Sequence, residues 1–208
     1  MRVCTQHSGG LLGRRISLMA LLLALALGGP AALHAQGAGV RQGFWIGFDL
    51  GYGTADISCD GCAAGDRRGG AVVGLAMGGT VSGRLLLGGE LNGWGKWGSA
   101  VDDGGVILGN TSLVAYFYPK ETGGFFVKAG AGLASYVAID SSGATTNGGG
   151  FGGLVGVGYD IPIGRTTSLT PVANFRFGSI GTIRDDEASY PVGLDQNVLE
   201  VGLGITWH

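Results

Sequence analysis

The sequence predicts an all-β fold, an eight-stranded antiparallel up-and-down transmembrane β-barrel preceded by a cleaved signal peptide. Eight segments alternate apolar with small or polar residues, and the connections between them alternate between short and long. Charged side chains inside these segments fall on the parity opposite to the apolar ones. The chain has 208 residues, a net charge of −2, 45 glycines and 5 prolines. This composition favours one folded domain and lacks the basic excess of a nucleic-acid-binding protein.

Residues 1–35 have the features of a secretory signal peptide. Two arginines precede the apolar run Ile16–Leu27, and a glycine–proline break then leads to a site of small residues that ends at Ala35. The run is shorter than the roughly 20 apolar residues that a membrane-spanning helix needs. We therefore expect cleavage after Ala35, so that the barrel domain occupies residues 36–208.

Eight later segments have the alternation expected of β-strands: 43–54, 70–81, 84–95, 106–118, 124–137, 150–163, 167–178 and 197–207. None of them approaches the roughly 18 apolar residues of a transmembrane helix, so a membrane span here requires a closed barrel. The connections at 82–83, 119–123 and 164–166 are short, whereas those at 55–69, 96–105, 138–149 and 179–196 are long. Short turns at one end and long loops at the other are typical of transmembrane barrels.

The two faces of the predicted strands differ in chemistry. Apolar residues share one parity, as in Phe44, Ile46, Phe48, Leu50 and Tyr52 of the first segment, Phe125, Val127 and Leu133 of the fifth, and Leu199, Val201, Leu203, Ile205 and Trp207 of the last. The charged residues well inside the segments take the other parity: Asp49, Glu90, Lys128, Asp160, Arg176 and Glu200. A lipid-facing Arg or Lys at mid-depth costs about 2 to 4 kcal/mol. The apolar parity is therefore predicted to face lipid, and the charged parity the lumen.

A soluble barrel of the lipocalin type is the alternative, because alternation alone does not say which face points inward. The solvent face of such a barrel would be rich in glycine and nearly bare of Lys and Glu, which disfavours it. Aromatic residues near the segment ends predict two interfacial girdles, with Phe44, Phe117, Phe125, Tyr159 and Trp207 at the short-turn end and Tyr52, Phe151 and Phe177 at the loop end.

The inward parity predicts a plugged lumen and no open pore. An eight-stranded barrel has an interior only just wide enough for side chains, and the many inward glycines leave room for the charged residues. Heights along neighbouring segments predict the ion pairs Lys128–Asp160 and Arg176–Glu200, and leave Asp49 and Glu90 to be balanced by Asn92, Asn174, water or a shared proton.

The last segment, Val198–Trp207, alternates and closes with an aromatic residue, and it resembles the C-terminal strand of outer-membrane barrels. This resemblance implies that Trp207 belongs to the signal that the barrel-assembly machinery reads during insertion. From Phe44 to His208 the layout of strands and loops is similar to that of the small OmpA-like and OmpX-like barrels. Short sequence segments such as GFWIG, which begins at Gly43, also resemble members of this group. The resemblance implies a monomer in the outer membrane of a Gram-negative bacterium, in contact with lipid and lipopolysaccharide. An OmpA-type peptidoglycan-binding domain is not expected.

Cys59 and Cys62 form a C-x-x-C pair in the first long connection. Such a pair can be a redox centre, half of a zinc site or a small disulfide. No βαβ pattern surrounds it and no second pair of ligands accompanies it in the sequence, and an exported chain meets an oxidising compartment. We expect a local disulfide between Cys59 and Cys62, without a bound metal or cofactor.

The sequence contains no recognisable catalytic constellation. His7 and His34 fall in the signal region and His208 is the last residue, so we expect no imidazole inside the barrel and no enzymatic activity. Carboxylate chemistry from Asp185, Asp186 or Glu187 stays open, although an acidic run is usually a solvated face. The acidic excess of the long connections indicates solvated loops, or divalent cations that bridge them to lipopolysaccharide.

The expected function is a structural or surface-interaction role for an integral outer-membrane barrel, without a nucleic-acid partner. A narrow solute-permeable barrel, an outer-membrane enzyme and a soluble ligand-binding barrel are the alternatives, in that order.

Overall fold

The computed structural model describes residues 41–59, 67–97, 104–184 and 189–208. Its strands are β1 (Phe44–Cys59), β2 (Arg68–Ser82), β3 (Leu85–Trp97), β4 (Gly105–Phe117), β5 (Phe125–Ile139), β6 (Thr145–Tyr159), β7 (Ile161–Pro162), β8 (Thr167–Arg184) and β9 (Ser189–Trp207). The expected signal peptide lies outside the described residues. Within the described ranges, no helix is long and apolar enough to cross a membrane.

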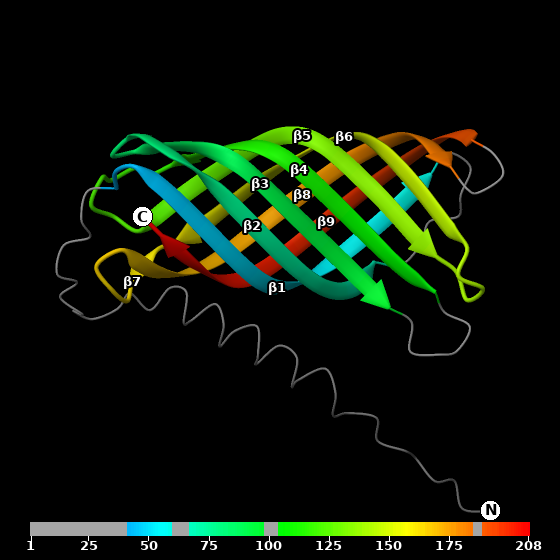
Figure 1. Ribbon diagram of the computed structural model, residues 1–208, viewed down its shortest axis with the longest axis horizontal. Helices are drawn as coiled ribbons and strands as arrows, with labels where there is room; N and C mark the ends of the chain where they lie inside the picture. The colour runs from blue at the N-terminus through cyan, green and yellow to red at the C-terminus, as the bar shows by residue number, and fades with distance from the viewer. Residues whose placement is uncertain (1–40, 60–66, 98–103, 185–188) are drawn as a thin grey trace, which may run out of the picture. The chain divides into compact units, whose positions relative to one another are not determined.

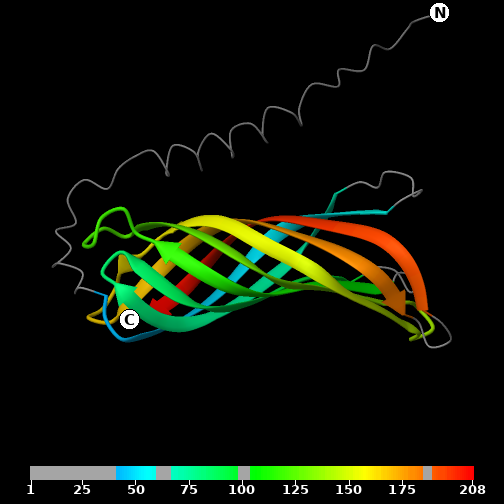
Figure 2. The same cartoon turned by 90° about the horizontal axis from the view of Figure 1, so that it is seen from above.

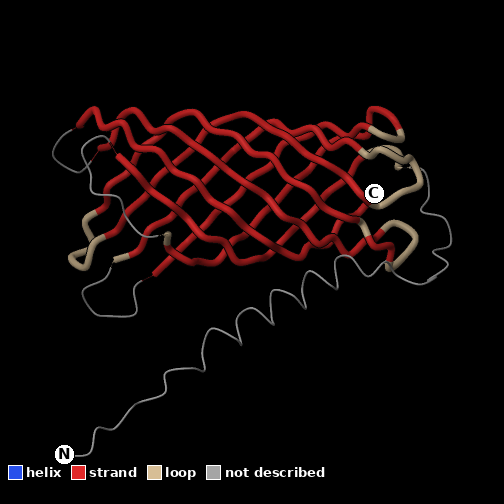
Figure 3. Tube along the Cα trace, turned by 180° about the vertical axis from the view of Figure 1, so that it is seen from behind, coloured by secondary structure: helices blue, strands red, loops and turns tan. Residues whose placement is uncertain are grey.

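The strands form one closed antiparallel ring (Figure 1). From β1 to β6 each strand pairs with the next along the chain, β8 pairs with β9, and β9 pairs with β1. The pairing of β6 with β8 closes the ring. The two-residue β7 pairs only with the start of β8, so it belongs to a turn and the ring has the predicted eight strands. Figures 2 and 3 show the strands inclined to the long axis of the barrel, with the connections confined to its two ends.

The strands extend further toward the loop end than the sequence predicted. β8 and β9 remain paired through Ser179↔Asp195 and up to Arg184↔Ser189, inside a segment predicted as a loop. The connection between β5 and β6 is a tight turn over residues 140–144, where Gly143 has a φ of +87°. In β8 and β9 the pairing continues where outward residues such as Ser179 and Asp195 are polar, so hydrophobic alternation does not reveal these strand ends.

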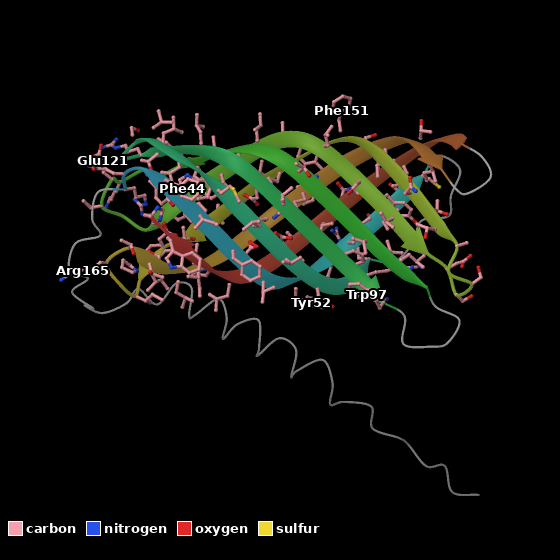
Figure 4. All side chains as sticks on the ribbon, in the orientation of Figure 1. Phe44, Tyr52, Trp97, Glu121, Phe151 and Arg165 are labelled. Atoms are coloured by element: carbon pink, nitrogen blue, oxygen red, sulfur yellow. The ribbon has the colours of Figure 1, made fainter. Side chains whose placement is uncertain are left out.

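The outer surface of the ring is apolar, as predicted from the parity. Leu113 and Phe151 are 79% and 80% exposed, and other outward side chains include Phe48, Leu133, Leu199 and Val201. Phe44, Tyr52, Trp97 and Phe151 project from the outside of the ribbon in Figure 4, whereas Glu121 and Arg165 lie at the short-turn end. Between the two aromatic girdles predicted from the sequence, the outward residues of the described strands are uncharged. This is the surface that a hydrocarbon layer requires.

Candidate functional site: the barrel lumen

The short-turn half of the lumen is filled by large side chains of inward parity. Trp45, Tyr116, Tyr118 and Phe126 are buried there with Leu86 and Leu154. The ring centroids of Trp45 and Tyr116 lie 4.9 Å apart, and those of Tyr116 and Phe126 lie 5.2 Å apart. These aromatic side chains pack against one another in the interior at this level.

Inward glycines make this filling feasible. A Cβ on Gly158 would lie 2.3 Å from Cζ of Phe126, and a Cβ on Gly74 would lie 2.0 Å from Oδ2 of Asp49. Both distances are shorter than contact distance, so a side chain at either position would displace the group it meets. The glycines predicted to relieve crowding therefore accommodate an aromatic ring in one case and a carboxylate in the other.

The centre of the lumen holds an ion pair between β3 and β5. Nζ of Lys128 lies 2.6 Å from Oε1 of Glu90, and both side chains are almost completely buried. The hydroxyl of Tyr116 donates to Oε2 of Glu90 over 2.6 Å, and Nδ2 of Asn92 donates to Oε1 over 3.1 Å. Glu90 therefore has a cation and two neutral donors, which together compensate for its burial.

A second ion pair lies between β8 and β9. Nη2 of Arg176 donates to Oε2 of Glu200, and Nδ2 of Asn174 donates to Oε1 of the same carboxylate over 2.6 Å. Arg176 and Glu200 are the pair expected from the sequence. Asn174 was expected to balance Asp49 or Glu90, but it donates to Glu200 instead. Arg176 and Glu200 lie on the paired strands β8 and β9, and both point inward. The pairing of these two strands therefore brings their side chains within hydrogen-bonding distance.

A third cluster closes the short-turn end around Asp160. Its Oδ2 accepts a hydrogen bond of 2.8 Å from the hydroxyl of Tyr118 and lies 3.5 Å from Nη2 of Arg41, while Oδ1 accepts one of 2.9 Å from Thr170. Nε2 of His208 lies 3.4 Å from Oδ2.

Arg41 is the residue that ties this cluster to the turns. Its guanidinium donates to the carbonyl oxygens of Glu121 and Gly123 over 3.0 and 2.8 Å, and its Cζ lies 3.5 Å from the ring centroid of Tyr118. Arg41 is only 4% exposed. A buried guanidinium with several acceptors and an aromatic face is held firmly, because each partner compensates part of its lost hydration.

The arrangement corrects the predicted partner of Lys128. Lys128 was expected to pair with Asp160, but its partner is Glu90, two strands away across the intervening β4. Inward side chains in so narrow a barrel reach across the lumen, so strand adjacency does not decide the pairing. Asp49 is half-buried, and its Oδ2 has no hydrogen-bond partner among the described residues.

The expectation that no imidazole lies inside the barrel is also wrong, because His208 folds back toward the buried Asp160. Sequence reasoning missed Arg41 and His208 because both lie outside the alternating segments, where parity carries no information. Tyr116 could have been found, since it is an inward-parity residue with a polar tip. Around Asp160 the hydroxyl of Thr170 donates to the carboxylate.

A cavity of about 40 Å³ lies between the central ion pair and the Asp160 cluster, lined by residues that include Asp49, Glu90, Lys128 and Tyr118. A polar space of this size holds only a few water molecules. The short-turn half of the lumen therefore contains a small internal space beside its packed side chains.

The remaining predicted residues lie away from the lumen clusters or are only partly described. Cys59 is disulfide-bonded, whereas its expected partner Cys62 and the acidic run 185–187 lie outside the described residues. Trp207 points outward, is 41% exposed and pairs with Ile46 and Thr167. Within the described residues, no group of three or more His, Cys, Asp or Glu side chains is placed to hold a metal ion.

No protein-family model and no curated protein sequence matches the chain. Among solved structures, it is similar to Neisserial surface protein A (NspA), at 17% identity over 79% of this chain and 96% of that one, with a TM-score of 0.51. It also matches Ail, the attachment invasion locus protein of Yersinia pestis, at 12% identity over 80% of this chain and 100% of that one, with a TM-score of 0.47. OprG from Pseudomonas aeruginosa matches at 15% identity over 82% and 99%, with a TM-score of 0.46.

The chain has the fold of a small eight-stranded outer-membrane barrel, as NspA has. Its uncharged outward face suits a hydrocarbon layer, and its buried charged side chains lie inside the ring.

Proposed function

We propose that this protein is a closed structural scaffold of the outer membrane that holds its long loops at the cell surface for interaction, without catalytic activity and without a solute pore. The observation that carries the proposal is the filled lumen. Aromatic side chains, two buried ion pairs and the Asp160 cluster occupy successive levels of the interior. Eight strands leave an interior that side chains can fill, and the packing of these groups below the loop end supports a closed lumen.

The length of the strands supports a role at the surface. A tilted transmembrane strand needs about 9 to 11 residues, whereas β8 has 18 and β9 has 19. In β1 the outward residues beyond Tyr52 are Thr54, Asp56 and Ser58, which suit water or lipid headgroups better than hydrocarbon. The barrel wall therefore continues past the apolar band and raises its loops above the membrane.

The proposed surroundings follow from the same surface. Outer-membrane lipid and lipopolysaccharide would contact the apolar band as neighbours, and the barrel-assembly machinery would act on the strand that ends at Trp207. Bridging divalent cations at the acidic loops stay a prediction that depends largely on residues outside the described ranges. A monomer is proposed because the closed ring offers no unpaired strand edge to a second copy.

A narrow solute-permeable barrel is the second candidate, and conductance separates it from the scaffold. The purified protein would be inserted into planar lipid bilayers, with a general porin as the positive control. We expect no stable single-channel current from the scaffold. Large, stable currents would contradict the plugged lumen, and recovery of the protein in the soluble periplasm, without heat-modifiable migration, would contradict the membrane assignment.

A further inference from the structure

The loop end of the barrel contains an open cavity of about 510 Å³. Ile57, Trp94, Val106 and Ala138 form apolar parts of its wall, and the cationic Arg68 and Lys96 also line it. These residues come from β1 to β5 and have inward parity. Ligand-binding pockets generally have volumes of about 300 to 1,000 Å³, so this loop-end cup is large enough to hold a small organic molecule.

The apolar wall of the loop-end cup is fixed in place. Trp94 is buried in a cluster with Ala55, Val72, Leu108 and Val198, against which Ile57 and Val106 pack. Nε1 of Trp94 donates to the carbonyl oxygen of Gly53 over 3.0 Å. This bond satisfies the polar edge of the indole and leaves an apolar ring at the base of the cup. A ligand would therefore meet a preformed apolar surface, which lowers the ordering cost of binding.

The charge of the loop-end cup is available for a ligand. Arg68 and Lys96 are exposed, and among the described residues neither forms an ion pair. Asp140 also lines the cup and keeps its negative charge, so the two cations of the wall exceed its one carboxylate by a single charge. The carboxylate of Asp140 is held by its own turn. Its Oδ1 accepts hydrogen bonds from N and Oγ of Ser142, at 2.8 and 2.6 Å, and from N of Ala144 at 3.0 Å.

We propose that the loop-end cup binds a small amphipathic anion from outside the cell. An aromatic ring or short hydrocarbon chain would lie against Val106 and Ala138, above the buried Trp94, and its carboxylate or sulfonate would be held by Arg68 and Lys96. Cationic side chains recognise such groups by charge-assisted hydrogen bonds. The inference rests on the proposed function, since a barrel sealed below the cup presents a binding site at the surface and no entrance to a channel.

The test uses the full protein in lipid nanodiscs and phenylbutyrate as the probe. Binding would be followed by calorimetry and by the NMR signal of the Trp94 indole N–H. We expect saturable binding of phenylbutyrate, with acetate and the uncharged phenylbutyramide binding at least about tenfold more weakly, since one lacks the apolar body and the other the charge.

Charge-removing variants locate the site. Arg68→Gln and Lys96→Gln should each weaken phenylbutyrate binding by about fivefold to tenfold, the effect of losing one charge-assisted hydrogen bond. Lys120→Gln is the matched control, because Lys120 is an exposed cation in the turn after β4, at the opposite end of the barrel. The Lys120→Gln variant should bind phenylbutyrate with unchanged affinity. The absence of saturable binding, or equal affinity in all three variants, would overturn the proposal.

A cavity-filling variant tests the position independently of charge. Ala138→Phe places a ring in the loop-end cup and should abolish binding while heat-modifiable migration shows that the barrel is still folded. Undiminished binding in the folded Ala138→Phe variant would place the ligand elsewhere and overturn the inference. Bilayer conductance is a separate readout, so a protein that neither binds the probe nor conducts ions would refute the cup and leave the closed scaffold standing.

Discussion

Replacing Lys128 by methionine tests the reasoning about the lumen most directly. Methionine keeps much of the volume of the lysine stem but leaves Glu90 without the cation that lies 2.6 Å from its Oε1. Removal of one partner from a buried pair costs about 3 to 5 kcal/mol. Glu90 keeps the hydrogen bonds from Tyr116 and Asn92. We therefore expect Lys128→Met to lower the free energy of unfolding by about 3 kcal/mol, at the lower end of that range.

A double-mutant cycle identifies the partner. Adding Glu90→Gln to Lys128→Met removes the uncompensated charge and should recover about 2 kcal/mol, since residues in one hydrogen-bond network couple by about 0.5 to 3 kcal/mol. The matched cycle pairs Lys128→Met with Asp160→Asn. Lys128 and Asp160 share no hydrogen-bond or ion-pair partner among the described residues, so these two effects should add to within about 0.5 kcal/mol.

Reversible urea unfolding in lipid vesicles, followed by tryptophan fluorescence, gives the free energies for both cycles. Heat-modifiable migration on gels reports independently whether each variant is folded before urea is added. Additivity in the Glu90 cycle, or strong coupling in the Asp160 cycle, would refute the lumen arrangement and restore the pairing predicted from strand adjacency.

Three further predictions concern assembly, oxidation and the lipid face. Trp207→Asp should reduce the folded protein in outer-membrane fractions, measured as the heat-modifiable band, while Trp207→Phe keeps it; wild-type assembly of the Asp variant would argue against an insertion signal. Mass spectrometry of unreduced peptides from intact outer membranes should find Cys59 joined to Cys62, and two free thiols there would contradict this. Leu113, 79% exposed on the outward face, should tolerate alanine, whereas Leu113→Arg should lower vesicle unfolding stability by about 2 to 4 kcal/mol. Equal urea midpoints for the two Leu113 variants would show that this face does not meet lipid.

The number of strands and the face on which each side chain lies could be predicted from the sequence. Both depend on the free-energy cost of placing polar or charged side chains in lipid, which recurs at every second residue of a strand. A charge such as that of Glu90 or Arg176 is costly on the lipid side, so parity alone places it in the lumen, where both are buried. This cost of facing lipid no longer applies beyond Tyr52, because the outward residues Thr54 and Asp56 lie past the apolar band. The loop-end extensions of the strands were therefore missed, because backbone pairing there leaves no hydrophobic pattern.

The partners inside the lumen depend on three-dimensional reach, which parity does not encode. Arg176 and Glu200 lie on paired strands, so adjacency found them. The side chain of Lys128 on β5 instead extends past β4 to Glu90 on β3. Ser112 of β4, which is paired with Glu90, is small enough not to block this contact. Predicting this pair would require the volumes of all the inward side chains at one level of the barrel.

The two ends of the barrel are closed to different degrees, and this difference links the lumen to the surface. At the short-turn end, Arg41 and His208 meet at Asp160 and join the residues that flank β1 and β9 to the turn after β6. At the loop end, the wall rises past the apolar band around a cavity of about 510 Å³ that Trp94 floors. On the proposed function, a solute entering from outside would meet the wall of this cavity and then the packed side chains below Trp94, so it would be bound at the surface and not passed to the periplasm.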